Sequence, residues 1–196
     1  MRVRFGILIA VLGLAVSVVG CGAPPTADID AAKTAITNAT TAGAGEYAAD
    51  SLKAAEDAQT ALDAELKAQD GKWFKSYDKA KELAVAAKAA GDKAAADAAA
   101  GKEKAKADAT QGIADAKTAL KEAEELLAKA PKGKGSATDI EAMKTDLTNA
   151  GTQIADAETA LSNGKFLDAK AKAESAKNAA TTVKTAVEEA KAMKKK

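Results

Sequence analysis

The sequence contains no histidine and a single cysteine, Cys21, and its only arginines are Arg2 and Arg4. Histidine is the commonest general base and a common metal ligand, and arginine is the usual bidentate partner of phosphate and carboxylate groups. These absences argue against an enzyme. We therefore predict no catalytic residue, no metal site and no cofactor.

Proline, aromatic residues and alternating β-branched runs are also scarce. Proline occurs only at positions 24, 25 and 131, and aromatic residues make up 3% of the chain. Alanine exceeds a quarter of the residues, and lysine, glutamate and leucine are frequent, a composition typical of long helices and coiled coils. The prediction is an all-α fold with a thin core, because alanine favours helix but buries little apolar area.

The first twenty residues form a basic start followed by an uncharged apolar run, Phe5 to Val19. As a helix this run would span about 22 Å, less than the roughly 30 Å of a bilayer core. The layout is typical of a cleaved signal peptide, predicted over residues 1–20. Its removal would leave 27 lysines against 28 acidic residues, and this near-neutral balance argues against a nucleic-acid partner.

The signal segment ends in Val18-Val19-Gly20-Cys21, which resembles a bacterial lipobox. The resemblance implies that Cys21 is diacylated and becomes the new N-terminus, so that residues 21–27 form a lipidated tether. It also implies a location in the cell envelope. Because Gly22, rather than aspartate, follows the cysteine, the expected location is the outer membrane, facing the periplasm.

Apolar residues at helical spacing predict three helices in each half of the chain. In the first half, Ile29, Ala32, Ile36 and Ala39 mark a stripe that ends at the glycines of residues 43–45. A second helix is predicted from Glu46 to Ala68, and a third begins near Trp73. In the second half, heptad spacing covers residues 113–130, 140–161 and 166–190, with a turn at Asn163-Gly164. Heptad helices with short loops predict elongated antiparallel hairpins or three-helix bundles with alanine-rich seams.

Two helical units are predicted, residues 28–100 and 101–196. Residues 91–105 contain Gly91 and Gly101 but few large side chains, so they are expected to form a helical connector that bends or frays. The alternative, a single helix through residues 73–130, would expose its apolar seam to a partner. The halves also share a Gly-Lys-aromatic sequence, Gly71-Lys72-Trp73 and Gly164-Lys165-Phe166, predicted to open the last helix of a hairpin in each. Duplication and convergence both remain open.

Aromatic residues gather at Trp73, Phe74 and Tyr77. Trp73 and Phe74 are adjacent, so they cannot both face one helix seam. The favoured interpretation is a hydrophobic plug that closes the end of the hairpin. The alternative is an interaction patch for glycan, lipid or a partner protein.

The chain ends in three lysines, which suit a helix C-terminus. An alanine-rich heptad helix between Cys21 and a terminal lysine resembles the murein lipoprotein of enteric bacteria. That resemblance implies covalent attachment of Lys196 to peptidoglycan, although this chain is longer and has several turns.

A second resemblance involves residues 42–48 (AGAGEYA) and 52–56 (LKAAE), followed by the Gly-Lys-aromatic turn. These are similar to uncharacterised alanine-rich envelope lipoproteins of Gram-negative bacteria, a domain of unknown function. The resemblance covers about residues 27–90 and implies location and a helical-hairpin fold only.

These patterns predict a non-enzymatic, lipid-anchored envelope protein that acts as a structural or protein-interaction module. Its expected partners are the membrane, through the N-terminal lipid, and a protein or cell-wall component. The alternatives are a periplasmic binder of lipid or a small hydrophobic ligand, and a murein-lipoprotein-like tether between membrane and peptidoglycan.

Overall fold

Six helices and no strand make up residues 23–130 and 136–193, the part of the chain that the computed structural model describes. The helices are listed in chain order: α1 (Thr26–Thr41), α2 (Ala44–Tyr47), α3 (Ala49–Asp70), α4 (Asp78–Ala128), α5 (Ser136–Ser162) and α6 (Phe166–Met193). The predicted all-α fold of elongated helical bundles is confirmed.

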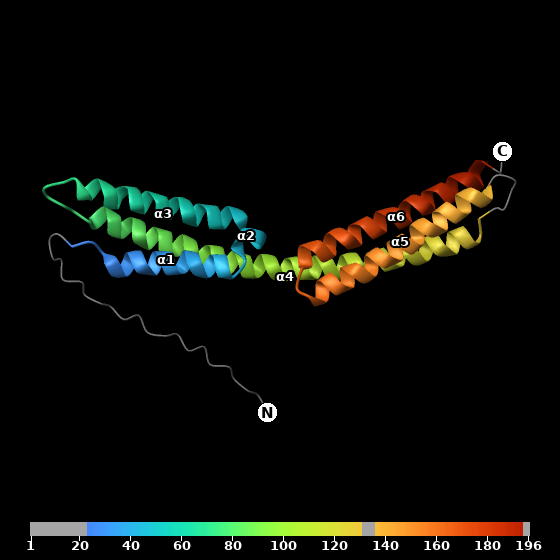
Figure 1. Cartoon of the computed structure of the whole chain (residues 1–196), viewed down its shortest axis with the longest axis horizontal. Coiled ribbons are helices and arrows are strands. Elements are labelled where there is room, and N and C mark those ends of the chain that lie inside the picture. Colours follow the sequence, from blue (N-terminus) through green and yellow to red (C-terminus); the bar gives the residue numbers. More distant parts are fainter. Residues whose placement is uncertain (1–22, 131–135, 194–196) are drawn as a thin grey trace, which may run out of the picture.

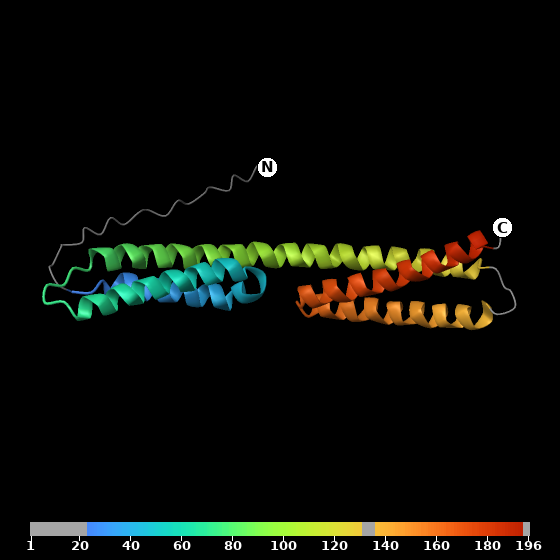
Figure 2. The same ribbon diagram turned by 90° about the horizontal axis from the view of Figure 1, so that it is seen from above.

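The helices form two three-helix units placed end to end along α4 (Figures 1 and 2). In the first unit, α1 to α3 pack against residues 78–101 of α4. In the second unit, α5 and α6 pack against residues 108–128. Helices α1 to α3 make no contact with α5 or α6, so within the described chain α4 alone joins the two units.

Residues 91–105 are helical, as predicted, but the fraying predicted for them is wrong. Helix α4 continues through them and is 51 residues long, about 77 Å at 1.5 Å per residue. Its seam is nevertheless not exposed, contrary to the expectation for a single helix. The two helix groups cover successive lengths of it.

Two glycines explain why the connector is helical instead of flexible. A Cβ atom at Gly91 would lie 2.8 Å from the backbone of Ala35 and Ile36 in α1. At Gly101 it would clash with the carbonyl oxygen of Tyr47. These glycines allow another helix to approach α4 backbone to backbone, and the packing offsets their low helix propensity.

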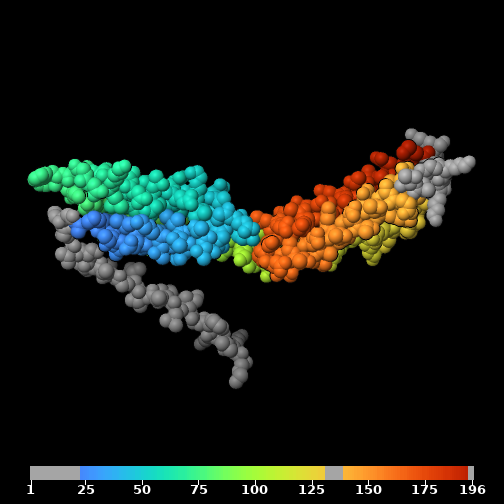
Figure 3. Space-filling model, in the orientation of Figure 1, coloured from blue at the N-terminus to red at the C-terminus, as the bar shows by residue number. Residues whose placement is uncertain are grey.

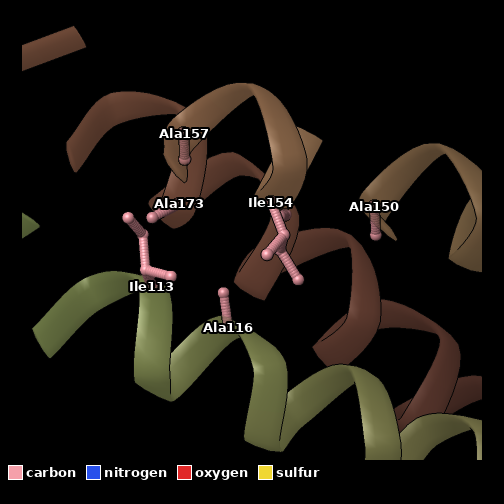
Figure 4. Close-up of a cluster of buried hydrophobic side chains, with 7 residues drawn as sticks. Ile113, Ala116, Ala150, Ile154, Ala157 and Ala173 are labelled. Carbon is pink, nitrogen blue, oxygen red and sulfur yellow. The ribbon is translucent and has the colours of Figure 1, made fainter. Parts of the chain in front are cut away.

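Alanine dominates the core in both units. It supplies 21 of the 30 buried apolar residues identified in the described chain, so the helices can approach closely. Figure 4 shows one cluster of the second unit, where the larger Ile113 and Ile154 fill the space among Ala116, Ala157 and Ala173.

The predicted heptad faces of the second unit match the buried positions closely. All seven buried residues of α6 lie on its predicted face: Phe166, Ala169, Ala173, Ala176, Ala180, Val183 and Val187. The turn before α6 is also confirmed. Gly164 has a φ of 75°, and Lys165 donates its N–H to the carbonyl of Ala160 at 2.9 Å, which is a Schellman ending.

Three helix boundaries or faces of the first unit differ from the predictions. The predicted second helix is interrupted at Ala48, whose φ of −151° separates α2 from α3. Helix α4 begins at Asp78 instead of near Trp73. In α1, Ala35 is buried where Ile36 was expected, because the backbone at Ala35 and Ile36 lies against Gly91.

A ladder of three ion pairs joins α4 to α6. Lys170 lies 3.1 Å from Asp108, Lys177 lies 2.9 Å from Asp115, and Lys184 lies 2.8 Å from Glu122. Both sets of partners are spaced by seven residues, so the ladder repeats once per heptad along two helices that run in the same direction (Figure 2).

The close contacts of the glycines predict that Gly→Ala substitutions at different positions of α4 have opposite effects on stability. Gly91→Ala and Gly101→Ala should each destabilise the fold by about 1–3 kcal/mol, because the added methyl group meets backbone atoms. Gly112→Ala is the matched control, since its Cβ would meet only the Ala173 methyl group at 3.5 Å. It should stabilise by about 0.5–1 kcal/mol through helix propensity. Urea unfolding followed by circular dichroism checks both directions, and equal effects at the three positions would contradict the packing role.

The ladder predicts a loss of stability in acid. Hydrogen bonds lower the pKa of Asp108 (from Lys104, then Lys170), of Asp115 (from Lys177) and of Glu122 (from Lys184). A lowered pKa stabilises the fold above the unfolded value of about 4, and this contribution is lost as the pH falls through the folded values. The melting temperature should therefore fall as the pH drops below about 4.

Replacing all three ladder carboxyls, by Asp108→Asn, Asp115→Asn and Glu122→Gln, should flatten this acid dependence. The matched control replaces three exposed carboxyls of the same unit, by Asp146→Asn, Asp156→Asn and Glu174→Gln. Thermal melts between pH 2 and 6 compare the two variants. If both flatten the curve equally, the ladder is not the source of the acid dependence.

Candidate functional site

The loop between α3 and α4, residues 71–77, carries the three clustered aromatic residues of the chain. It forms the tip of the first unit, at the end of the molecule away from α5 and α6 (Figures 1 and 3). Helix α1 begins at this same end in both ribbon views. The tip is therefore close to the point where the chain enters the first unit.

A buried glutamine ties down the base of this loop. Gln69 is 4% exposed and occupies the third buried position of α3, after Ala55 and Leu62 at seven-residue spacing. Its Oε1 accepts the backbone N–H of Ser76 at 3.2 Å, and its Nε2 donates to the Glu65 carboxylate at 2.6 Å. One side chain thus links the end of α3 to the segment that precedes α4.

The Glu65 carboxylate extends this link to α4. Lys79, in the first turn of α4, lies 3.3 Å from it. The hydrogen bond from Gln69, together with Lys79, lowers the pKa of Glu65 and keeps it ionised. The ends of the loop are therefore tied together by the hydrogen bond between Ser76 and Gln69 and by the ion pair between Lys79 and Glu65, while the bond from Gln69 to Glu65 joins these two groups within α3.

Tyr77 closes the end of the helical unit. It is the residue immediately before α4, and its half-buried ring packs against the apolar cluster that contains Ile29, Leu62 and Ala80. The predicted plug is therefore present at Tyr77.

The same prediction is wrong for the two other rings. Trp73 is 92% exposed and Phe74 is 87% exposed. The physical reason is the late start of α4: both residues precede Asp78 and lie outside the helix whose seam they were expected to fill. Two adjacent large apolar side chains therefore project into solvent from the tip, on a loop whose base is held by Gln69.

The Gly-Lys-aromatic sequences are not structurally equivalent, contrary to the prediction. Phe166 is 8% exposed and is the first residue of α6, whereas Trp73 lies in a loop. Gly164 adopts a positive φ, whereas Gly71 has a φ of −81°. The resemblance between these two turns is confined to the sequence.

The two predicted attachment residues, Cys21 and Lys196, lie outside the described residues. Among residues 23–130 and 136–193, no helix is both long and apolar enough to cross a membrane, and no group of three or more metal-binding side chains comes together. The acidic residues Glu124 and Glu125 are exposed, and Glu122 belongs to the ladder.

A groove of about 370 Å³ lies between α4 and α5 in the second unit. Leu127, Ala128 and Leu147 line it, together with Glu124, Lys144 and Thr148. The groove is open to solvent, so it would cover only part of a small hydrophobic ligand, whereas ligand pockets bury most of the surface of theirs.

Sequence reasoning missed Gln69, although the sequence contained a signal for it. Positions 55, 62 and 69 repeat every seven residues, and the third carries an amide where the first two carry apolar side chains. A polar residue at a core position next to a turn indicates a side chain that bonds to the backbone of that turn.

The burial pattern predicts that the three rings contribute differently to the free energy of unfolding. The double variant Trp73→Ala/Phe74→Ala should change the free energy of unfolding by less than about 0.5 kcal/mol, since both rings are in solvent. Tyr77→Ala should cost about 1–2 kcal/mol, because it removes a half-buried ring from the end of the core. Urea unfolding measures both. A large loss in the double variant would restore the plug interpretation for Trp73 and Phe74.

Comparisons with protein-family models, with curated proteins and with solved structures find no match to this chain. The residues and their placement are therefore the basis for assigning a function.

Proposed function

We propose that this protein is a non-enzymatic, lipid-anchored protein of the bacterial cell envelope, and that it works as a rigid rod presenting surfaces to a protein or cell-wall partner. The observation that carries the proposal is the lipobox-like Val18-Val19-Gly20-Cys21 after a basic and apolar leader. Two acyl chains on one cysteine would hold the chain firmly, whereas a single chain binds a membrane only marginally.

The placement of the described residues supports this arrangement. Helix α1 begins at Thr26, only five residues after Cys21, and it begins at one end of the molecule (Figure 2). A lipid on Cys21 would thus attach the rod by its end. The continuous α4 is about 77 Å long at 1.5 Å per residue and would carry the second unit on the half that points away from the lipid, a shape suited to spanning distance.

The murein-lipoprotein-like tether is a second candidate, favoured by the placement of the start of α1 and the end of α6 at opposite ends of the rod (Figure 1). The last described residue, Met193, lies at the far end of the second unit (Figure 1). A rod with a lipid at one end and a peptidoglycan-linked Lys196 at the other would join the outer membrane to the cell wall. The third alternative, a binder of lipid or small hydrophobic ligand, gains less support from the open groove between α4 and α5.

Replacing Cys21 tests the anchor. In a Gram-negative host, Cys21→Ala should move the protein out of the detergent-soluble membrane fraction or stop its processing, while the helical circular dichroism stays unchanged. Ser17→Ala, in the leader but outside the four-residue lipobox, is the matched control and should leave the protein in the outer membrane. Mass spectrometry of the wild-type N-terminal peptide should show a diacylated Cys21.

The same fractions distinguish the two candidates. Complete extraction by detergent supports a free rod with a protein partner. A detergent-resistant fraction that lysozyme releases, and that Lys196→Ala but not Lys195→Ala abolishes, supports the tether. A Cys21→Ala protein that is processed and remains in the membrane fraction would overturn the anchor itself.

A further inference from the structure

The exposed rings at the tip are unusual in a chain with so few aromatic residues. Trp73 and Phe74 are the two most exposed large hydrophobic residues identified in the described chain, and they are adjacent. Their exposure does not reflect a loop without internal structure, because Gln69, Glu65 and Lys79 tie its two ends together. Rings held in solvent on a fixed base indicate a surface that receives an apolar partner.

The position of the tip identifies that partner. Ile29, in the first turn of α1, belongs to the same apolar cluster against which Tyr77 packs, so the start of α1 and the end of the loop are neighbours. Cys21 is two residues from residue 23, and two extended residues reach only about 7 Å. Acyl chains on Cys21 would therefore enter a bilayer beside the end of the rod that carries Trp73 and Phe74.

We infer that the loop of residues 71–77 is a second membrane contact, in which Trp73 and Phe74 insert into the headgroup region of the lipid leaflet that holds Cys21. This inference rests on the proposed lipid anchor. Tryptophan suits that depth because its ring is apolar while its indole N–H can bond to water or lipid oxygens. The two contacts together would hold the rod by its end in one orientation.

The charges around the rings indicate that apolar insertion, and not attraction to anionic lipid, carries the contact. Lys72 and Lys75 flank the rings, and their stems can lie along the headgroups with the ammonium groups in water. Asp70 and Asp78 lie on either side of them, so these four side chains carry no net charge. The Lys75 ammonium is also 3.7 Å from the Asp70 carboxylate. Zwitterionic phosphatidylcholine should therefore suffice.

Trp73 is the only tryptophan of the chain, so its fluorescence reports the tip without any label. The processed, lipidated protein is reconstituted into phosphatidylcholine vesicles, with or without bromine on the lipid acyl chains. We expect the emission of Trp73 in the vesicle-bound protein to lie at a shorter wavelength than in the urea-unfolded protein. Brominated lipid should quench this emission about twofold or more, as for a ring at the depth of an aromatic belt. Acrylamide, a quencher dissolved in the water, should quench the Trp73 emission of the vesicle-bound protein less than that of the urea-unfolded protein without detergent.

A moved tryptophan provides the matched control. Trp73→Phe combined with Leu167→Trp places the sole tryptophan at a half-exposed position near the start of α6, midway along the rod (Figure 2). The loop keeps two aromatic rings, so membrane contact is retained. The emission of this variant should be insensitive to brominated lipid.

The outcomes separate this inference from the anchor on which it rests. A protein that floats with the vesicles but whose Trp73 is quenched by acrylamide and not by bromine would overturn the membrane contact and leave the anchor intact. Trp73 shielded from both quenchers would also overturn it, in favour of a protein partner or a second copy of the chain. Failure to float would overturn the anchor, and the tip contact with it.

Discussion

The structure depends on the unbroken seam of α4. The buried residues of this helix recur every three, four or seven positions from Ala80 to Leu127, and two separate groups of helices pack on successive lengths of it. Because these groups do not touch each other, the rod has no shared core that could hold its units together. The backbone hydrogen bonds of α4 between residues 101 and 108 are the physical connection between the two units.

Small residues let other helices pack closely on this seam, but they do little to determine the register in which those helices pack. Alanine and glycine let backbones approach, as Gly91 does against α1 and Gly101 against Tyr47. Yet an alanine seam shifted by one heptad still presents alanine to alanine. The few large core residues, such as Ile113, Ile154 and Phe166, differ between registers and can therefore select one. The ladder between α4 and α6 contributes less to this choice, because its seven-residue spacing would keep two of the three pairs after a shift of one heptad.

The parts of the fold that the sequence predicts well are those determined within one helix. The faces of residues 140–161 and 166–190 and the turn at Gly164 follow from heptad spacing and from the left-handed backbone that glycine favours. The role of Gly91 depends on its contact with α1, which the sequence around Gly91 does not reveal. The low helix propensity of Gly91 predicted a weak point in the helix, and only the position of α1 shows that Gly91 makes a close contact between two helices.

The aromatic loop illustrates the same limit at the candidate site. The favoured interpretation assigned the rings to a plug at the end of the hairpin, although the adjacent Trp73 and Phe74 could not both face one seam. Because α4 begins at Asp78, Tyr77 packs against the apolar cluster at that end while Trp73 and Phe74 are exposed. Nothing in the residues 73–77 distinguishes the three rings before the helix boundary is known. Gln69 could have been found from the sequence, since its amide interrupts an apolar heptad. Its hydrogen bond from the Ser76 N–H depends on the geometry of the loop and could not.

The continuity of α4 also determines what a membrane contact at the tip could accomplish. A lipid on Cys21 would hold the end of the rod at the membrane but would not by itself fix the direction of the rod. Two additional rings beside the anchor would fix direction as well, and a helix without a break would transmit that direction to the second unit. A frayed connector at residues 91–105 would lose it. The glycine contacts that keep this segment helical are therefore as important to the proposed function as the anchor, although they lie far from it along the rod.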